Sequence, residues 1–170
     1  MRWHLVDRID ELIPGERARG VRRWDPTLPF FEDHFPTFPV VPGVLTMESL
    51  AQLAGKLIGM SVRLSRGDWP FPILSMMDKV KFRKFVLPGQ AVTLEARIKS
   101  LRDESAHVDV VARVEGRAVA QAEQFFVFNA VPLASDVERA AVEATERAEL
   151  RRLWPGYAAH DTPPPSGSGS

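Results

Sequence analysis

Hydrophobic and polar residues alternate along two regions of the chain, one on each side of a long apolar segment. The alternation over residues 3–12 and 16–24, interrupted by Pro14-Gly15, predicts a two-stranded hairpin. In the second half the same period predicts four more strands, over residues 73–85, 91–101, 107–114 and 118–129. Strand runs of this length indicate a long antiparallel sheet.

The apolar segment between these regions predicts one buried helix over residues 43–63. Apolar side chains cover most of its circumference, a pattern typical of a helix surrounded by protein. Its polar residues Glu48, Gln52 and Lys56 recur every four positions and form a single stripe. One sheet cannot shield such a helix on every side. We therefore expect the sheet to curve round the helix and two chains to pair.

The remaining segments are a loop and a C-terminal extension. Residues 25–43 contain five prolines and four phenylalanines, which predicts an ordered, packed, non-repetitive loop. Residues 136–154 carry a weak apolar stripe and predict a surface helix packed by one edge, and the tail ending in PPPSGSGS predicts disorder. We expect a domain over residues 1–130, a helical extension over 131–155 and a disordered tail over 156–170.

Composition narrows the class of protein. The chain has 170 residues, 45% hydrophobic and 26% charged, with a formal net charge of +0, so it lacks the global basic field of nucleic-acid binders. The absence of cysteine excludes disulfides and thiolate chemistry and fits a reducing cytoplasm. There is no signal-peptide pattern, and the polar stripe argues against a membrane span. We expect a cytoplasmic protein.

The loop and the start of the helix carry a dense motif. Residues 34–52 read HFPTFPVVPGVLTMESLAQ, with His34 and Glu48 fourteen positions apart. This segment resembles the active-site signature of FabZ-type 3-hydroxyacyl-(acyl-carrier-protein) dehydratases of the FabA/FabZ family. The segments LVDRIDELIPGERARGV and MDKVKFRKFVLPG also resemble that family, so the similarity covers about residues 5–128.

The resemblance implies a fold and a site. The fold is the α+β hot-dog fold, a curved antiparallel sheet wrapped round one long central helix, here with an extra C-terminal helix. The minimal unit is a homodimer in which His34 of one subunit faces Glu48 of the other, and such dimers can form a trimer of dimers. The substrate arrives on the phosphopantetheine arm of acyl carrier protein, and no cofactor is implied.

The residue types suit this chemistry. Dehydration needs a base for the C2 proton, and histidine titrates near neutral pH. It also needs an acid for the C3 hydroxyl, and desolvation on an apolar helix favours the protonated form of a carboxyl group such as Glu48. The backbone N–H of Gly43, at the helix N-terminus, is the candidate donor to the developing thioester oxyanion. Gln52, one turn after Glu48, is placed to orient the carboxylate.

Each residue also has a structural interpretation. His34 alone could be a solvated loop histidine, and Glu48 could form a core ion pair, for example with Lys56 or Arg63 across a dimer. Gly43 could serve only a tight turn, and Gln52 could simply pack. The family spacing favours the catalytic interpretation of His34 and Glu48. No HExxH or clustered spacing indicates a metal.

Four basic residues form a further candidate surface. Simple alternation places Lys79, Lys81 and Arg83 on one face of a strand, with Lys84 beside them. Such a series is usually a solvated face. It is also a candidate docking surface for the acidic acyl carrier protein.

The chain departs from the family pattern at several positions. Asp33 replaces the usual glycine before the histidine and puts a negative charge beside it, which could either favour the protonated imidazole of His34 or alter the loop. Ile73 stands where the family often has a gating tyrosine. The short N-terminal helix of the family is missing, and the C-terminal helix is added. These changes indicate a specialised paralogue.

Three other functions compete with the dehydratase. A dehydratase that also isomerises the double bond usually has aspartate at the position of Glu48, which argues against that variant. A non-catalytic hot-dog subunit that binds an acyl chain or carrier protein would have no need of both His34 and Glu48. A hot-dog thioesterase is disfavoured by the HFP segment.

Overall fold

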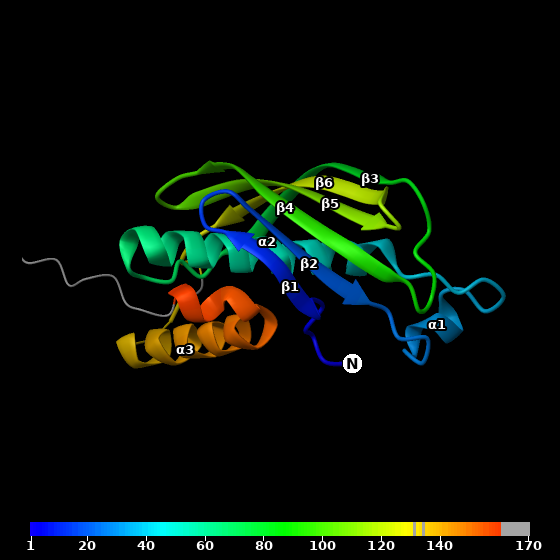
Figure 1. Cartoon of the computed structure of the whole chain (residues 1–170), viewed down its shortest axis with the longest axis horizontal. Helices are drawn as coiled ribbons and strands as arrows, with labels where there is room; N and C mark the ends of the chain where they lie inside the picture. The colour runs from blue at the N-terminus through cyan, green and yellow to red at the C-terminus, as the bar shows by residue number, and fades with distance from the viewer. Residues whose placement is uncertain (131, 134, 161–170) are drawn as a thin grey trace, which may run out of the picture.

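The sheet has six strands and only antiparallel pairs. A computed structural model describes residues 1–130, 132–133 and 135–160. The strands, in sheet order β1-β2-β4-β5-β6-β3, are β1 Arg8–Ile13, β2 Arg17–Arg23, β4 Ala91–Leu101, β5 Ser105–Val114, β6 Arg117–Val127 and β3 Ile73–Phe82. Figure 1 shows the sheet lying along the long helix α2. The predicted α+β hot-dog architecture is confirmed.

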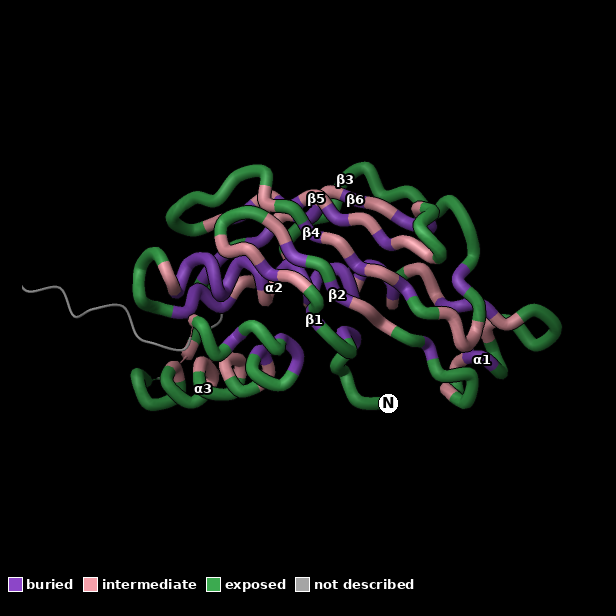
Figure 2. The backbone as a smooth tube through the Cα atoms, in the orientation of Figure 1, coloured by how far each residue is buried: buried purple, intermediate pink, exposed green. Residues whose placement is uncertain are grey.

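The helix α2, Gly43–Arg66, forms the centre of the core and contacts all six strands. Figure 2 shows buried residues following it along its length. The helix ends where Gly67 adopts a left-handed φ of 87°, a conformation that glycine reaches without a Cβ penalty. The sheet faces it with alternating side chains, so that Val92, Leu94 and Ala96 of β4 are buried. The periodicities thus predicted both the helix and the strand faces.

The C-terminal helix α3, Asp136–Leu153, begins at Ser135, whose side chain accepts a hydrogen bond from the Glu138 backbone N–H at 3.2 Å. In Figure 1 it lies on the side of α2 away from most of the sheet. Leu150 and Leu153 are its buried residues, so packing by one edge agrees with the prediction.

The chain after α3 differs from the predicted tail. Pro155–His160 forms the 3₁₀ helix η1, in which Tyr157 is 1% exposed and accepts a hydrogen bond from Arg147 at 3.1 Å. The Trp154 ring stands edge-on to Tyr157 and stacks on His160. Burial of aromatic side chains therefore orders residues 156–160. The prediction of disorder for these residues relied on the Pro/Gly/Ser-rich composition that follows them. The rest of the predicted tail, 161–170, lies outside the described residues.

Two local features were not predicted. A short helix α1, Phe30–Asp33, interrupts the proline-rich loop and buries Phe31. The register of β3 against β6 shifts between Asp78 and Lys81, and Lys79 has a φ of 50°. The strand ends at Phe82, before Arg83. The simple alternation expected for Lys79, Lys81 and Arg83 is therefore wrong, although all of them are exposed.

Candidate functional site

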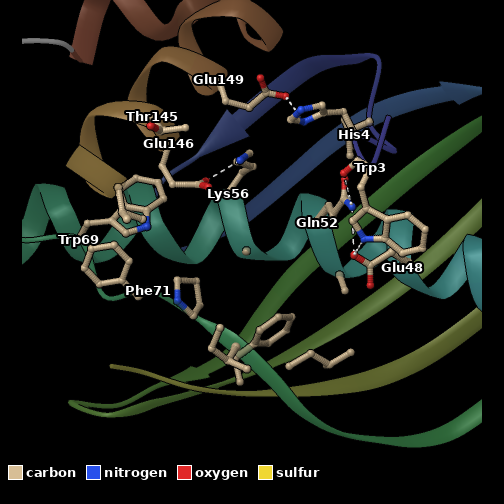
Figure 3. A pocket seen from close by; sticks show the side chains of 18 of the residues that line it. Trp3, His4, Glu48, Gln52, Lys56, Trp69, Phe71, Thr145, Glu146 and Glu149 are labelled. Carbon is tan, nitrogen blue, oxygen red and sulfur yellow. Dashed lines mark hydrogen bonds and ion pairs between the residues drawn. The ribbon is translucent and has the colours of Figure 1, made fainter. Parts of the chain in front are cut away.

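Glu48 lies on the polar stripe of α2 and is held by two hydrogen bonds. The indole Nε1 of Trp3 and the amide Nε2 of Gln52 both donate to Glu48 Oε1, each at 3.0 Å (Figure 3). No described residue donates to Oε2, so that oxygen is available to a ligand. The carboxylate is half-buried and its orientation is fixed from one side.

Gln52 also ties the N-terminal segment to α2. Its Oε1 accepts from the Leu5 backbone N–H at 2.7 Å, and its Nε2 donates to the Trp3 carbonyl at 3.2 Å. The predicted hydrogen bond from Gln52 to Glu48 is present. The part played by Trp3 was not predicted, because 45 residues separate it from Glu48 in the chain. An indole N–H is a donor that needs an acceptor, and this was the available signal.

The alternative ion pairs of Glu48 are not formed within the chain. Lys56 Nζ lies 2.6 Å from Glu146 Oε2, and Arg63 Nε lies 3.5 Å from Glu143 Oε1. Within the chain, these two cations of α2 therefore pair with carboxylates of α3. Within one chain, Glu48 is therefore bonded by two neutral donors, Trp3 and Gln52.

His34 follows α1 and has a defined tautomer. Its Nδ1 lies 3.1 Å from the Val40 carbonyl oxygen, and its ring stacks on Phe35 with centroids 4.3 Å apart. A carbonyl oxygen only accepts, so Nδ1 carries the hydrogen, and in the neutral imidazole Nε2 then presents a lone pair. This is the form that a general base requires. The neighbouring Asp33 is the exposed last residue of α1.

Gly43 is the first residue of α2, after Pro42. No described residue accepts a hydrogen bond from its N–H. A Cβ built at Gly43 would lie 2.6 Å from Cε1 of Phe82, so any larger residue here would displace the exposed ring of Phe82. The position therefore combines an available helix N-terminal donor with a close approach by β3.

Glu48 borders a cavity of about 740 Å³. Figure 3 shows Glu48 and Gln52 toward one end and Trp69 and Phe71 toward the other. Ile73, at the position of the expected tyrosine gate, also lines it. His34 does not, so the single chain does not bring the two predicted catalytic side chains into one cavity.

Two of the four predicted docking residues line a second hollow. Arg83 and Lys84 line a space of about 500 Å³ together with aromatic and aliphatic side chains of Phe38, Phe82, Phe85 and Leu87. Lys79 pairs with Glu123 at 3.2 Å while staying 67% exposed, and Arg83 Nε donates to Gln121 at 3.0 Å. Lys79 therefore lies away from the second hollow, along β3.

The strongest metal-like grouping lies elsewhere. His107, Asp109 and Glu123 present ligand atoms within 4.8 Å of one another. Lys79 and Lys99 already bond Glu123 and hold the pKa of its carboxyl below the ordinary value, mainly through the hydrogen bond from Lys79. Two ammonium groups at this position disfavour a cation, so the cluster is better explained as an ion-pair network.

No helix in the part of the chain that the structure describes has the length and apolarity needed to cross a bilayer.

Sequence comparisons identify close relatives. A sequence model of the FabA-like domain matches residues 1–123. The chain is 42% identical over 123 residues to the 3-hydroxyacyl-(acyl-carrier-protein) dehydratase FabZ of Caldanaerobacter subterraneus, covering 72% of this chain and 85% of the relative. It is 40% identical over 125 residues to the FabZ of Roseiflexus castenholzii, covering 74% and 85%.

Structural comparisons agree on the fold. The dehydratase heterocomplex ApeI:P of Xenorhabdus doucetiae superposes with a TM-score of 0.62 at 10% identity, covering 83% of this chain and 90% of that one. The uncharacterised protein PH1136 of Pyrococcus horikoshii gives a TM-score of 0.54 at 17% identity, covering 81% and 90%. From the sequence matches, the chain belongs to the FabA-like domain family and, within it, is similar to the FabZ-type dehydratases.

Proposed function

We propose that the protein converts a 3-hydroxyacyl thioester carried on acyl carrier protein into the trans-2-enoyl thioester and water. The observation that carries the proposal is Glu48, held on one oxygen by Trp3 and Gln52 at the edge of a 740 Å³ cavity. The relatives named FabZ dehydratase support the same reaction.

Each group has a defined step. His34 Nε2 takes the C2 proton, because its Nδ1 is already committed to the Val40 carbonyl. The electron pair moves onto the thioester oxygen, where the Gly43 N–H and the positive end of α2 stabilise it. The C3–O bond then breaks, and Glu48 gives its proton to the departing hydroxyl so that water leaves. Proton exchange with solvent returns His34 and Glu48 to their starting forms.

A composite site across a dimer accounts for the separation of His34 from the Glu48 cavity. The sheet has two edges, and η1 contacts β1 at one of them. The other edge, β3, is exposed at every residue but Leu74, and the apolar Met76, Met77 and Val80 are among those exposed. An uncovered apolar edge strand is a template for pairing with another chain. Pairing of β3 with β3 would bring His34 of one subunit toward Glu48 of the other.

Carrier-protein docking is supported by charge. Lys81, Arg83 and Lys84 are exposed, and the last two line the second hollow beside Phe82, which itself touches Gly43. A cationic rim around an apolar entrance suits an acidic carrier that delivers an apolar chain.

The test follows the enoyl thioester absorbance in both directions with purified protein and hydroxyacyl or enoyl carrier-protein substrates. We expect His34→Ala and Glu48→Gln each to lower kcat by about 10²–10⁴-fold, the usual contribution of a positioned acid or base. His107→Ala and Glu104→Gln are the matched controls, at positions outside the site, and should keep activity.

The alternative is a non-catalytic subunit that binds an acyl chain or carrier protein. Wild-type protein that binds acyl carrier protein but turns over neither substrate would favour this alternative and contradict the dehydratase.

A further inference from the structure

The C-terminal helix α3 forms one wall of the cavity that Glu48 borders. Its lining residues recur at helical spacing, so they share one face: Val142, Thr145, Glu146, Glu149 and Leu153. The opposite wall is the stripe of α2 that carries Glu48, and the segment leading into β3 lines a further side, so that the cavity is a partly open groove. Figure 3 shows Glu146 of α3 directed toward Lys56 of α2 and Glu149 directed toward His4.

Three acidic residues fix α3 in this position. Glu143, Glu146 and Glu149 occur every three residues and pair with Arg63, Lys56 and His4 at 3.5, 2.6 and 3.2 Å. Arg152 donates to Glu149 and, together with the neighbouring cations, holds the pKa of that carboxyl below its ordinary value. The apolar side chain of Leu150 on α3 is fully buried. The helix that forms this wall is therefore packed against the rest of the protein.

The cavity has a polar end and an apolar end. Trp3, Gln52 and Glu48 lie at the first. At the second, the Trp69 ring packs directly on α2, because a Cβ on Gly59 would come 2.2 Å from its Cζ2. Gly59 lies eleven positions after Glu48 on α2, a distance along the helix axis of about 16 Å at 1.5 Å per residue. This shape suits a ligand with a reacting head and a long hydrocarbon tail.

α3 also lies outside the part of the chain that defines the family. The FabA-like match ends at residue 123, and α3 begins at Asp136. A cavity wall supplied from outside the common domain can change the ligand that fits without changing the groups that react.

We propose that α3 is a specificity-determining wall that sets the length of the acyl chain. The reacting head of the thioester lies at Glu48, and the unbranched tail runs along α2 toward Trp69 and Phe71, beside the Lys56–Glu146 ion pair that joins α3 to α2. This inference rests on the proposed function, because it assigns the tail of the same substrate.

The test uses substitutions on α3 that make the cavity narrower. Val142→Trp fills the lined face, and Thr145→Phe does so from an exposed position where added volume does not disturb the core. Val137→Trp, at a side chain 78% exposed on the same helix, is the matched control. The kcat/KM is measured for four-carbon and sixteen-carbon hydroxyacyl carrier-protein substrates. We expect the long-to-short ratio to fall about tenfold or more in the first two variants, and to stay unchanged in the control.

Two results would overturn the proposal in folded variants, as judged by circular dichroism. One is an unchanged ratio, with both substrates affected alike. The other is a changed oligomeric mass with an unchanged ratio, which would make this cavity an interface between copies of the chain.

Failure of the proposed function gives a different signature. Wild-type protein would then turn over neither substrate, and the tail site would still be read by displacement of the fluorescent fatty acid cis-parinaric acid. Weaker binding in Val142→Trp and Thr145→Phe, but not in Val137→Trp, would support the α3 site. Equal binding in all of them would overturn it.

Discussion

Two neutral groups, on Trp3 and Gln52, donate hydrogen bonds to one oxygen of Glu48. Only one of these two bonds was predicted from the sequence. Gln52 was predictable because residues four apart on a helix are neighbours. Trp3 was not, because a contact across 45 residues depends on where the fold places the N-terminal segment. The lone pair of His34 likewise depends on the Val40 carbonyl, which no spacing rule places.

The donors to Glu48 should act on kcat. Trp3→Phe keeps the ring but removes the N–H, and Gln52→Leu removes the second donor. We expect each to lower kcat, by up to about a hundredfold for a misplaced catalytic group, with little change in KM. Steady-state kinetics with one substrate measure the split. A rise in KM at constant kcat would instead assign the two residues to substrate binding.

At the scale of elements, alternation and apolar periodicity predicted the six strands and both long helices, but not the details of their ends. Alternation carries no information about register, so the bulge at Lys79 was missed. The short helices α1 and η1 depend on the packing of Phe31 and Tyr157. The contact of β3 with the start of α2, Phe82 against Gly43, is a meeting of two elements that only the fold reveals.

This contact separates the two interpretations of Gly43. Gly43→Ala should lower the free energy of unfolding by less than the roughly 1–3 kcal/mol typical of overpacking in a core, because the Phe82 ring is 56% exposed and can move, and it should lower activity as well. Adding Phe82→Ala removes the ring that the new methyl group would strike. Thermal or urea unfolding and kcat are measured for both single variants and the double variant.

If the Gly43 N–H receives the oxyanion, the double variant should regain stability relative to Gly43→Ala but remain slow, because the methyl group still crowds the ligand. Recovery of both stability and kcat to the level of Phe82→Ala would leave Gly43 a spacing role only.

At the scale of the whole molecule, the sequence predicted pairing of two chains from a helix too apolar for one sheet to cover. In the structure, the edge strand β3 is exposed and so is available to pair with a second chain. The cavity nearby is lined by Glu48 but not by His34. A closed two-fold pair would complete two sites, each with one residue from either chain.

Mixed dimers provide the decisive measurement. Co-expressing His34→Ala with Glu48→Gln gives one intact site in each mixed dimer, so random pairing should restore about a quarter of wild-type activity. Each variant alone should stay inactive. If both residues of a site came from the same chain, every site would carry a defect and mixing would restore nothing.

The bare edge of β3 also bears on how the protein behaves at low concentration. If a second chain completes each site, then dissociation removes activity and support for the fold together, and both depend on mass action. Specific activity should fall on dilution below the dissociation constant of the pair, while pre-incubation at high concentration should protect it. An assay at nanomolar protein could therefore report an inactive enzyme whose residues are all intact.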